Sequence, residues 1–279
     1  MQNIKDNMKS YKMTDEEKKE VERYLNMSDS ERQVEFYNMT EGSLHLEDNI
    51  NCDVCKNRGY IAIVDNNTMK IKECECMKKR KLYKRFQECG ISREQLQNYT
   101  FANYRITSEW QKALMDKMKD YCMNLDKSKS WLYLGGNTGS GKTHLCTALF
   151  QRLINNGMTG RYMIWNSEIS QLVMLKRSFY AENQDKYVDR IEELINCDVL
   201  YIDDFMQRDI SIDDSLNIAY EIINTRYNDP NKITIISSEL LRNDLEQLIG
   251  SVFGRIYQRT DSGKYFINII GNDKNYRLK

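Results

Sequence analysis

The chain has 279 residues, with 41 lysines and arginines against 41 aspartates and glutamates, so its formal net charge at pH 7 is zero. This length leads us to expect two domains, and the balanced charge excludes a global field that attracts nucleic acid. Residues 1–50 contain no apolar signal segment, and no stretch approaches ~18 consecutive apolar residues, so we expect a soluble, cytoplasmic protein without membrane contacts.

Residues 1–50 are predicted to form a polar, helical N-terminal segment. Thr14 to Glu17 has the pattern of a capping box, and Val21, Tyr24 and Leu25 follow at helical spacing. Too few apolar residues recur for this segment to build a core of its own. Two interpretations stay open: a docking element that orders on a partner, or a solvated helix packed on its own protein.

Residues 51–89 are predicted to form a zinc-binding hairpin module followed by a basic helix and linker. Two strand-like stretches, 59–64 and 68–72, flank Asp65-Asn66-Asn67, which predicts a β-hairpin that brings two cysteine pairs together. In a reducing compartment, four such thiolates are suited to a tetrahedral Zn2+ site. Reduced cysteines without metal remain the alternative. The four cysteines are Cys52, Cys55, Cys74 and Cys76.

A basic run follows the last cysteine. Six cations and two aromatic side chains occupy the nine positions from Lys78 to Phe86. Phosphate contacts and base stacking use these residue types, so the run is a candidate surface for single-stranded DNA. A solvated helix face is the competing interpretation.

The most informative motif runs from Gly136 to Thr143. It fits the phosphate-binding loop G-x-x-x-x-G-K-[ST], with an apolar strand-like run at 131–134 before it and helical spacing after it. Lys142 is predicted to reach the β- and γ-phosphates and Thr143 to ligate Mg2+. The residues predicted to bind ATP or ADP here are Gly136, Asn137, Thr138, Gly139, Ser140, Gly141, Lys142, Thr143 and the adjacent His144.

Residues 90–279 are predicted to form one α/β ATPase domain. After the phosphate loop, strand-like segments at 162–165, 199–203, 233–237 and 265–270 alternate with helical stretches. This alternation predicts a mostly parallel sheet covered by helices on both faces.

The strand at 199–203 ends in two carboxylates. Asp203 lies 61 residues after Lys142 (203 − 142), as in the Walker B pattern. We expect Asp203 to hold Mg2+ and Asp204 to orient and deprotonate the attacking water.

Polar residues also follow the next strand, and a pair of arginines lies further along the chain. Ser238 and Glu239 stand where a γ-phosphate sensor is expected, at the end of the strand 233–237. Arg255 and Arg259 are one helical turn apart and are candidate arginine fingers that act on a neighbouring subunit's nucleotide.

The chain resembles the bacterial and phage replicative helicase loaders of the DnaC/DnaI type, a branch of the AAA+ ATPases. Five segments carry the resemblance: GGNTGSGKTHL at 135–145, DVLYIDDF at 198–205, TIISSEL at 234–240, FGRIYQR at 253–259 and NYRL at 275–278. The similarity covers about residues 90–279, and the cysteine module resembles the zinc-binding N-terminal region of DnaI-like loaders.

The resemblance implies a function and several residue roles. It implies an AAA+ core without a helical lid, and the nine residues after Ile270 are also too few for one. Arg259 is the better finger candidate, and Arg277 falls at the sensor-2 position that contacts nucleotide in cis. The implied partners are the hexameric replicative helicase, single-stranded DNA and further copies of the chain, with ATP, Mg2+ and Zn2+ as cofactors.

Two positions depart from the family pattern. The acidic pair is Asp203-Asp204 where many AAA+ proteins have Asp-Glu, which predicts slow, partner-stimulated hydrolysis. Glu239 stands where the family often has asparagine, so Ser238 is a candidate for the sensor role instead.

Three alternatives to a helicase loader remain at this point. An IstB-like transposition helper shares the ATPase core but acts with a transposase on duplex DNA. A small-molecule P-loop kinase would need an acceptor site, which the sequence does not indicate. A non-catalytic adaptor would bind ATP without turnover.

Overall fold

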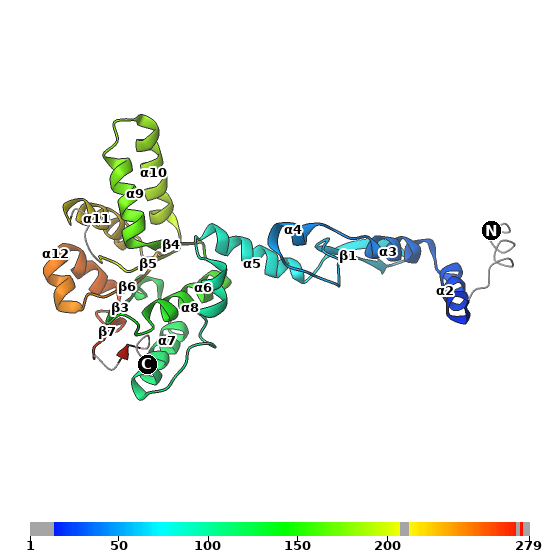
Figure 1. The fold of residues 1–279 in the computed structure, drawn as a ribbon, viewed down its shortest axis with the longest axis horizontal. Helices are drawn as coiled ribbons and strands as arrows, with labels where there is room; N and C mark the ends of the chain where they lie inside the picture. Colours follow the sequence, from blue (N-terminus) through cyan, green and yellow to red (C-terminus); the bar gives the residue numbers. More distant parts are fainter. Residues whose placement is uncertain (1–13, 207–211, 272–273, 276–279) are drawn as a thin grey trace. The chain divides into compact units, whose positions relative to one another are not determined.

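The computed structural model of the protein describes residues 14–206, 212–271 and 274–275 (Figure 1). The chain divides into two compact units, Met1–Tyr83 and Lys84–Lys279. The sequence predicted three parts, with boundaries after residues 50 and 89. In the structure, the segment before residue 50 belongs to the same unit as the hairpin, and the boundary between the units falls inside the basic helix α5 (Cys76–Glu88).

In the described part of the N-terminal unit, from residue 14 onward, three helices precede a two-stranded antiparallel sheet. The elements are α2 (Asp15–Asn26), α3 (Asp29–Met39), α4 (Leu44–Asp48), β1 (Tyr60–Asp65) and β2 (Thr68–Glu73). The capping box at Thr14 is confirmed, because its hydroxyl accepts from the Glu17 amide.

The predicted hairpin is also confirmed. Asp65 pairs with Thr68, and the two asparagines between them have φ angles of 50° and 57°, as a tight two-residue hairpin turn requires. Helix α3 packs on this hairpin: the side-chain amide of Asn38 donates to the Ala62 carbonyl and accepts from the Ala62 amide, both at 2.9 Å. Asn38 thereby satisfies backbone groups on the outer edge of β1.

The C-terminal unit is an α/β domain. Its elements are α6 (Arg93–Asn98), α7 (Glu109–Met123), a 3-10 turn η1 (Lys127–Lys129), β3 (Leu132–Gly136), α8 (Lys142–Asn155), β4 (Gly160–Ile164), α9 (Trp165–Lys176), α10 (Ala181–Asn196), β5 (Val199–Asp203), α11 (Ile212–Asn228), β6 (Ile233–Ser238), α12 (Arg242–Arg259) and β7 (Phe266–Ile269). Among the described residues, no helix is both long and apolar enough to span a bilayer.

The five strands form a wholly parallel sheet in the order β4-β5-β6-β3-β7. The predicted P-loop ATPase core is therefore confirmed. Alternation along β5 sends Leu200 and Ile202 into a core shared with α9 to α12, whereas Tyr201 faces Phe150 of α8, at 6.1 Å between ring centroids. Figure 1 shows α9 and α10 side by side on one side of the sheet, with α8 on the other.

The order of the strands brings three chain segments together at the carboxyl edge of the sheet. Strand β6 lies between β5 and β3, so Gly136, Asp203 and Ser238 end neighbouring strands. Ligands of open parallel sheets bind at this edge. The fold therefore places both acidic-strand and phosphate-loop motifs in one site.

Candidate functional site

The phosphate loop joins β3 to α8, and its glycines are required by the backbone path. Gly136, Gly139 and Gly141 have φ angles of 134°, 73° and 85°, which residues with a Cβ rarely adopt. A Cβ on Gly136 would also lie 2.1 Å from the Ile269 carbonyl oxygen of β7. The loop then enters α8 at Lys142, so the positive end of a 14-residue helix faces the site.

Lys142 is folded across the loop. Its Nζ donates to the carbonyls of Gly136 and Asn137, at 2.8 and 2.9 Å. Burial lowers the pKa of this ammonium, and the carboxylates of Glu239 and Asp204 oppose that shift. Lys142 is therefore the cation of this site that can bind phosphates. Its contacts to the two carbonyls can be replaced by contacts to a ligand of higher charge.

Some of the other loop residues stabilise the loop, and others face the cavity. The Asn137 side chain donates to the Gly271 carbonyl at 2.9 Å, and Ser140 donates to the Asn137 carbonyl at 2.7 Å, so both stabilise the loop. Thr138 is exposed, and its hydroxyl hydrogen-bonds to the Glu239 carboxylate across the loop.

Asp203 is the most heavily bonded carboxylate of the site, although it is only 4% exposed. The hydroxyls of Tyr201 and Tyr162 donate to it at 2.8 and 3.1 Å, and Ser237 donates to the same oxygen as Tyr201. Thr143 Oγ1 lies 3.2 Å from Asp203 Oδ1. A hydroxyl and a carboxylate side by side are hard oxygen donors, so these two residues fit Mg2+, which would neutralise phosphate charge when bound.

A cavity of about 290 Å3 lies in front of these motifs. Asp204 and Glu239 both reach it, from the ends of β5 and β6. Asp204 has a φ of 55°, and its amide donates to Ser237 Oγ at 3.2 Å, so the backbone turns sharply where β5 ends. The lining residues are Tyr99, Thr138, Gly139, Gly141, Lys142, Thr143, His144, Asp204 and Glu239.

One end of the cavity is aromatic, a feature that the sequence motifs do not indicate. His144 packs against Tyr99 and Tyr104, with ring centroids 5.2 and 5.3 Å away, and its Nε2 hydrogen-bonds the Thr100 carbonyl at 2.7 Å. A Cβ on Gly141 would lie 3.1 Å from the Tyr104 ring. The segment 99–104 therefore closes over the loop from a distant part of the sequence. Its tyrosines belong to no phosphate motif, so only their aromatic character could have signalled them.

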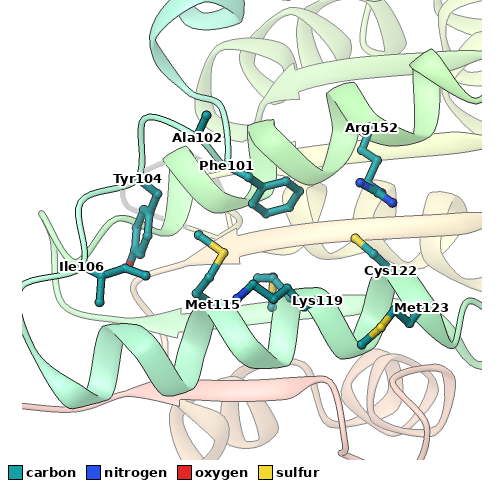
Figure 2. Close-up of a pocket in the computed structure, with 10 residues that line it drawn as sticks. Phe101, Ala102, Tyr104, Ile106, Met115, Lys119, Cys122, Met123 and Arg152 are labelled. Atoms are coloured by element: carbon teal, nitrogen blue, oxygen red, sulfur yellow. The ribbon is translucent and has the colours of Figure 1, made fainter.

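A second cavity, of about 520 Å3, lies beyond the same segment (Figure 2). Figure 2 shows Phe101, Tyr104 and Ile106 on one side and side chains of α7 on the other, with Arg152 of α8 at the rim. Tyr104 lines this cavity and also packs on the phosphate loop. Its lining is Phe101, Ala102, Tyr104, Ile106, Met115, Met118, Lys119, Cys122, Met123 and Arg152.

Ser238, the predicted sensor residue, is placed by its contacts inside the sheet edge. It is fully buried: its hydroxyl donates to the Phe205 carbonyl at 2.7 Å and accepts from the Leu240 amide at 3.0 Å. It therefore holds the ends of β5 and β6 together and does not line the phosphate cavity. Glu239 is the residue of this pair that reaches the cavity. Arg277, the predicted sensor-2 residue, lies outside the described residues.

Arg259, the predicted arginine finger, is held inside its own subunit in this structure. It is 5% exposed and lies over the Trp131 ring, 5.1 Å from the centroid. These contacts place the side chain against the end of α12. Its guanidinium donates to five backbone carbonyls, those of Tyr227, Asp229, Lys127, Pro230 and Lys232, at 2.7 to 3.4 Å.

Arg255, one turn earlier, is differently placed. It is half-buried, and its guanidinium lies 5.1 Å from the centroid of Tyr220 and 5.9 Å from that of Tyr227. Its Nη1 donates to the Ser251 carbonyl on its own helix. These contacts orient the side chain without enclosing it.

The four cysteines predicted to bind zinc converge in the N-terminal unit. Their Sγ atoms all lie within 4.8 Å of one another, with Cys52 and Cys74 3.8 Å apart and Cys55 and Cys76 3.5 Å apart. Although burial raises it, hydrogen bonds from the Gly59 amide and the other thiols lower the pKa of Cys55 to about 7. The first thiolate ligand is therefore available near neutral pH.

The basic run forms α5, and part of its charge is used internally. Arg80 is buried, hydrogen-bonds the Asp48 carboxylate and donates to the Ile50 carbonyl at 2.6 Å. Lys78 pairs with Glu75 at 2.9 Å and Lys81 pairs with Glu73 at 2.5 Å. Within the part of the chain that the structure describes, Lys79, Lys84 and Arg85 form no ion pair.

Comparison with known proteins gives one family match. The model of the family "IstB-like ATP binding protein" matches residues 65–253, which is more than half of the chain. Among solved structures, one described as a DNA replication initiation factor aligns with a TM-score of 0.50 at 19% identity, covering 64% of this chain and 52% of the other. That likeness supports the fold alone.

Individual relatives share 24 to 30% sequence identity with this chain. The phage-like element PBSX protein XkdC of Bacillus subtilis is 26% identical over 239 residues, 82% of this chain and 86% of XkdC. The uncharacterized protein YqaM of Bacillus subtilis is 24% identical over 220 residues, 74% of this chain and 66% of YqaM. The replicative helicase loader DnaC of Buchnera aphidicola is 30% identical over 112 residues, 40% of this chain and 44% of DnaC.

The contacts of Arg259 predict a structural phenotype for its removal. Replacing Arg259 with alanine removes one donor from each of five backbone carbonyls, of which only those of Asp229 and Lys232 have another donor among the contacts of the described residues, so we expect the free energy of unfolding to fall by about 3 kcal/mol. The measurement is thermal unfolding followed by circular dichroism.

Arg255→Ala is the matched control on the same helix. We expect its midpoint to stay within about 1 °C of the unsubstituted protein. If Arg259→Ala unfolds at the same midpoint temperature as the unsubstituted protein, the structural role of Arg259 is contradicted.

Proposed function

Because the chain belongs to the family of IstB-like ATP-binding proteins, we propose that it is an ATP-dependent loader of the replicative DNA helicase. The prediction of an AAA+ ATPase is confirmed at the level of that family. One observation carries the proposal: Lys142, Thr143 and Asp203 meet at one sheet edge, in a chain whose relatives include a DnaC helicase loader. Helicase binding and delivery are proposals for this chain.

The nucleotide cycle follows from the contacts of the site. Lys142 exchanges its two carbonyl contacts for the β- and γ-phosphates, while Thr143 and Asp203 hold Mg2+. The nucleobase lies at the aromatic end, against His144 and Tyr99. Slow hydrolysis that partners accelerate would make the bound nucleotide a timer for release of the helicase.

Self-association is the second part of the proposal. Arg255 takes the role of arginine finger from Arg259, because it is the one of the two whose guanidinium is not enclosed by backbone carbonyls. In a ring or spiral of copies, it would add positive charge to the neighbouring subunit's phosphates.

In this proposal the N-terminal unit binds the helicase, and a zinc ion stabilises the fold of that unit. A Zn–S bond of about 2.3 Å in a tetrahedron puts neighbouring sulfurs about 3.8 Å apart. Two of the Sγ separations, 3.8 and 3.5 Å, are close to that value, and all four sulfurs lie within 4.8 Å of one another. When bound, zinc would hold the two ends of the hairpin module together and stabilise a unit too small to build a large core.

Single-stranded DNA is proposed to contact the exposed cations of α5. Lys79, Lys84 and Arg85 are the cations of this helix that form no ion pair in the described part of the chain. Arg80 holds the structural contacts, so these three side chains can bind phosphates while the contacts of Arg80 stay intact.

An IstB-like transposition helper is the second candidate, because the family model itself carries that name. The four-cysteine cluster favours the loader, as the resemblance to DnaI-like proteins includes such a module. Preference for duplex over single-stranded DNA would favour the helper instead.

The zinc proposal predicts one metal ion per chain. We expect elemental analysis of the purified protein to give close to one equivalent of Zn2+, and chelation to unfold the N-terminal unit. Cys76→Ser removes a buried ligand and should lose the metal, whereas Cys122→Ser, outside the cluster, should retain it. Metal-free protein with an intact N-terminal unit would contradict the proposal.

The loader proposal predicts a nucleotide-dependent complex. The chain is mixed with a hexameric replicative helicase, with and without ATP, and analysed by gel filtration with light scattering. We expect a large complex whose mass changes with nucleotide, and Lys142→Ala should remove that change. No complex under either condition would contradict the loader function.

A further inference from the structure

Two carboxylates face the phosphate cavity in addition to the buried magnesium ligand. Asp204 ends β5 and Glu239 follows β6, and both line the same 290 Å3 space. Phosphates repel carboxylates unless a proton or a metal ion intervenes, so a second half-buried acid lining this cavity calls for a chemical role. Asp203, in contrast, is buried and receives several hydroxyl donors.

The contacts show which end of the cavity each group occupies. Thr138, at the beginning of the phosphate loop, hydrogen-bonds Glu239, whereas His144, after the loop, packs on Tyr99. Lys142 and Thr143 lie between these ends at the start of α8. A nucleotide with its base at His144 therefore has its γ-phosphate toward Thr138 and Glu239.

Reach distinguishes the two acids. In-line displacement needs a water on the far side of the γ-phosphorus from the oxygen that leaves with ADP. The amide of Asp204 is bound to Ser237, and its carboxylate has one methylene fewer than that of Glu239. Glu239 extends from the neighbouring strand as far as the loop itself, because it contacts Thr138. Its carboxylate can therefore lie beyond the γ-phosphate.

We propose that Glu239 is the general base of ATP hydrolysis in this chain and that Asp204 orients the water. The role rests on the proposed ATPase function. As the water oxygen bonds to the γ-phosphorus, the bond from that phosphorus to the bridging oxygen breaks and ADP leaves. One proton of the water passes to the Glu239 carboxylate and is then released to phosphate or solvent. The shorter acid at 204 and the longer acid at 239 thus act as one pair.

The test separates turnover from binding in the full-length protein. A fluorescent ATP analogue gives the dissociation constant, and hydrolysis of γ-labelled ATP under single-turnover conditions gives the chemical rate. For Glu239→Gln, which keeps shape but loses the base, we expect a rate about 100-fold lower with affinity for ATP unchanged or tighter. Glu239→Asp should retain more activity than Glu239→Gln. Glu246→Gln, an exposed acid on α12, is the matched control and should match the unsubstituted rate.

Each other outcome overturns the proposal in a recognisable way. A Glu239→Gln rate within threefold of normal, with Glu239→Ala inactive, would make the residue a hydrogen-bonding sensor. A larger loss in Asp204→Asn than in Glu239→Gln would return the base to Asp204. If the unsubstituted chain binds ATP but shows no turnover, the hydrolysis proposal itself fails, and the role of Glu239 fails with it.

Discussion

The buried Asp203 carboxylate is the interaction on which the site depends. It joins four chain segments, because Tyr162 comes from β4, Tyr201 from β5, Ser237 from β6 and Thr143 from the helix after the phosphate loop. A charge with only 4% exposure is tolerable because hydroxyl donors surround it. The same carboxylate that fixes the strand ends is therefore already aimed at the position where Mg2+ would join Thr143 to the phosphates.

Buried arginines perform a similar task at the opposite edge of the sheet, where β5 and β6 begin. Arg226 is fully buried, and its guanidinium binds the carbonyls of Leu194, Ile195, Cys197, Asp198 and Ile233 and the hydroxyl of Thr234. Burial lowers the pKa of Arg226, but hydrogen bonds to the carbonyls stabilise the charged guanidinium. Together with Arg259, it closes the C-terminal ends of helices onto the sheet. These residues support the site without taking part in its chemistry.

The parts of the site predictable from sequence are those in which chemistry requires a local pattern. The spacing of the motifs made the glycines of the phosphate loop, Lys142 and the Asp203-Asp204 pair predictable. The hairpin turn was predictable because asparagines readily adopt the positive φ angles that Asn66 and Asn67 have. The burial of Arg259 and Ser238 could not be predicted from the sequence, because the backbone carbonyls to which they donate lie in other segments of the chain, and a sequence motif does not show such contacts. Tyr104 was missed for the same reason, since its contact with Gly141 exists only after the chain folds back.

If Asp203 links the fold of the sheet edge to magnesium-dependent nucleotide binding, its removal must change how Mg2+ affects affinity. The decisive measurement is the affinity for a slowly hydrolysed ATP analogue, measured calorimetrically across a range of Mg2+ concentrations in the unsubstituted protein and in Asp203→Asn. We expect Mg2+ to tighten binding to the unsubstituted protein, and we expect Asp203→Asn, checked to be folded by circular dichroism, to lose this dependence. An equal Mg2+ dependence in both proteins would show that Asp203 is not the link.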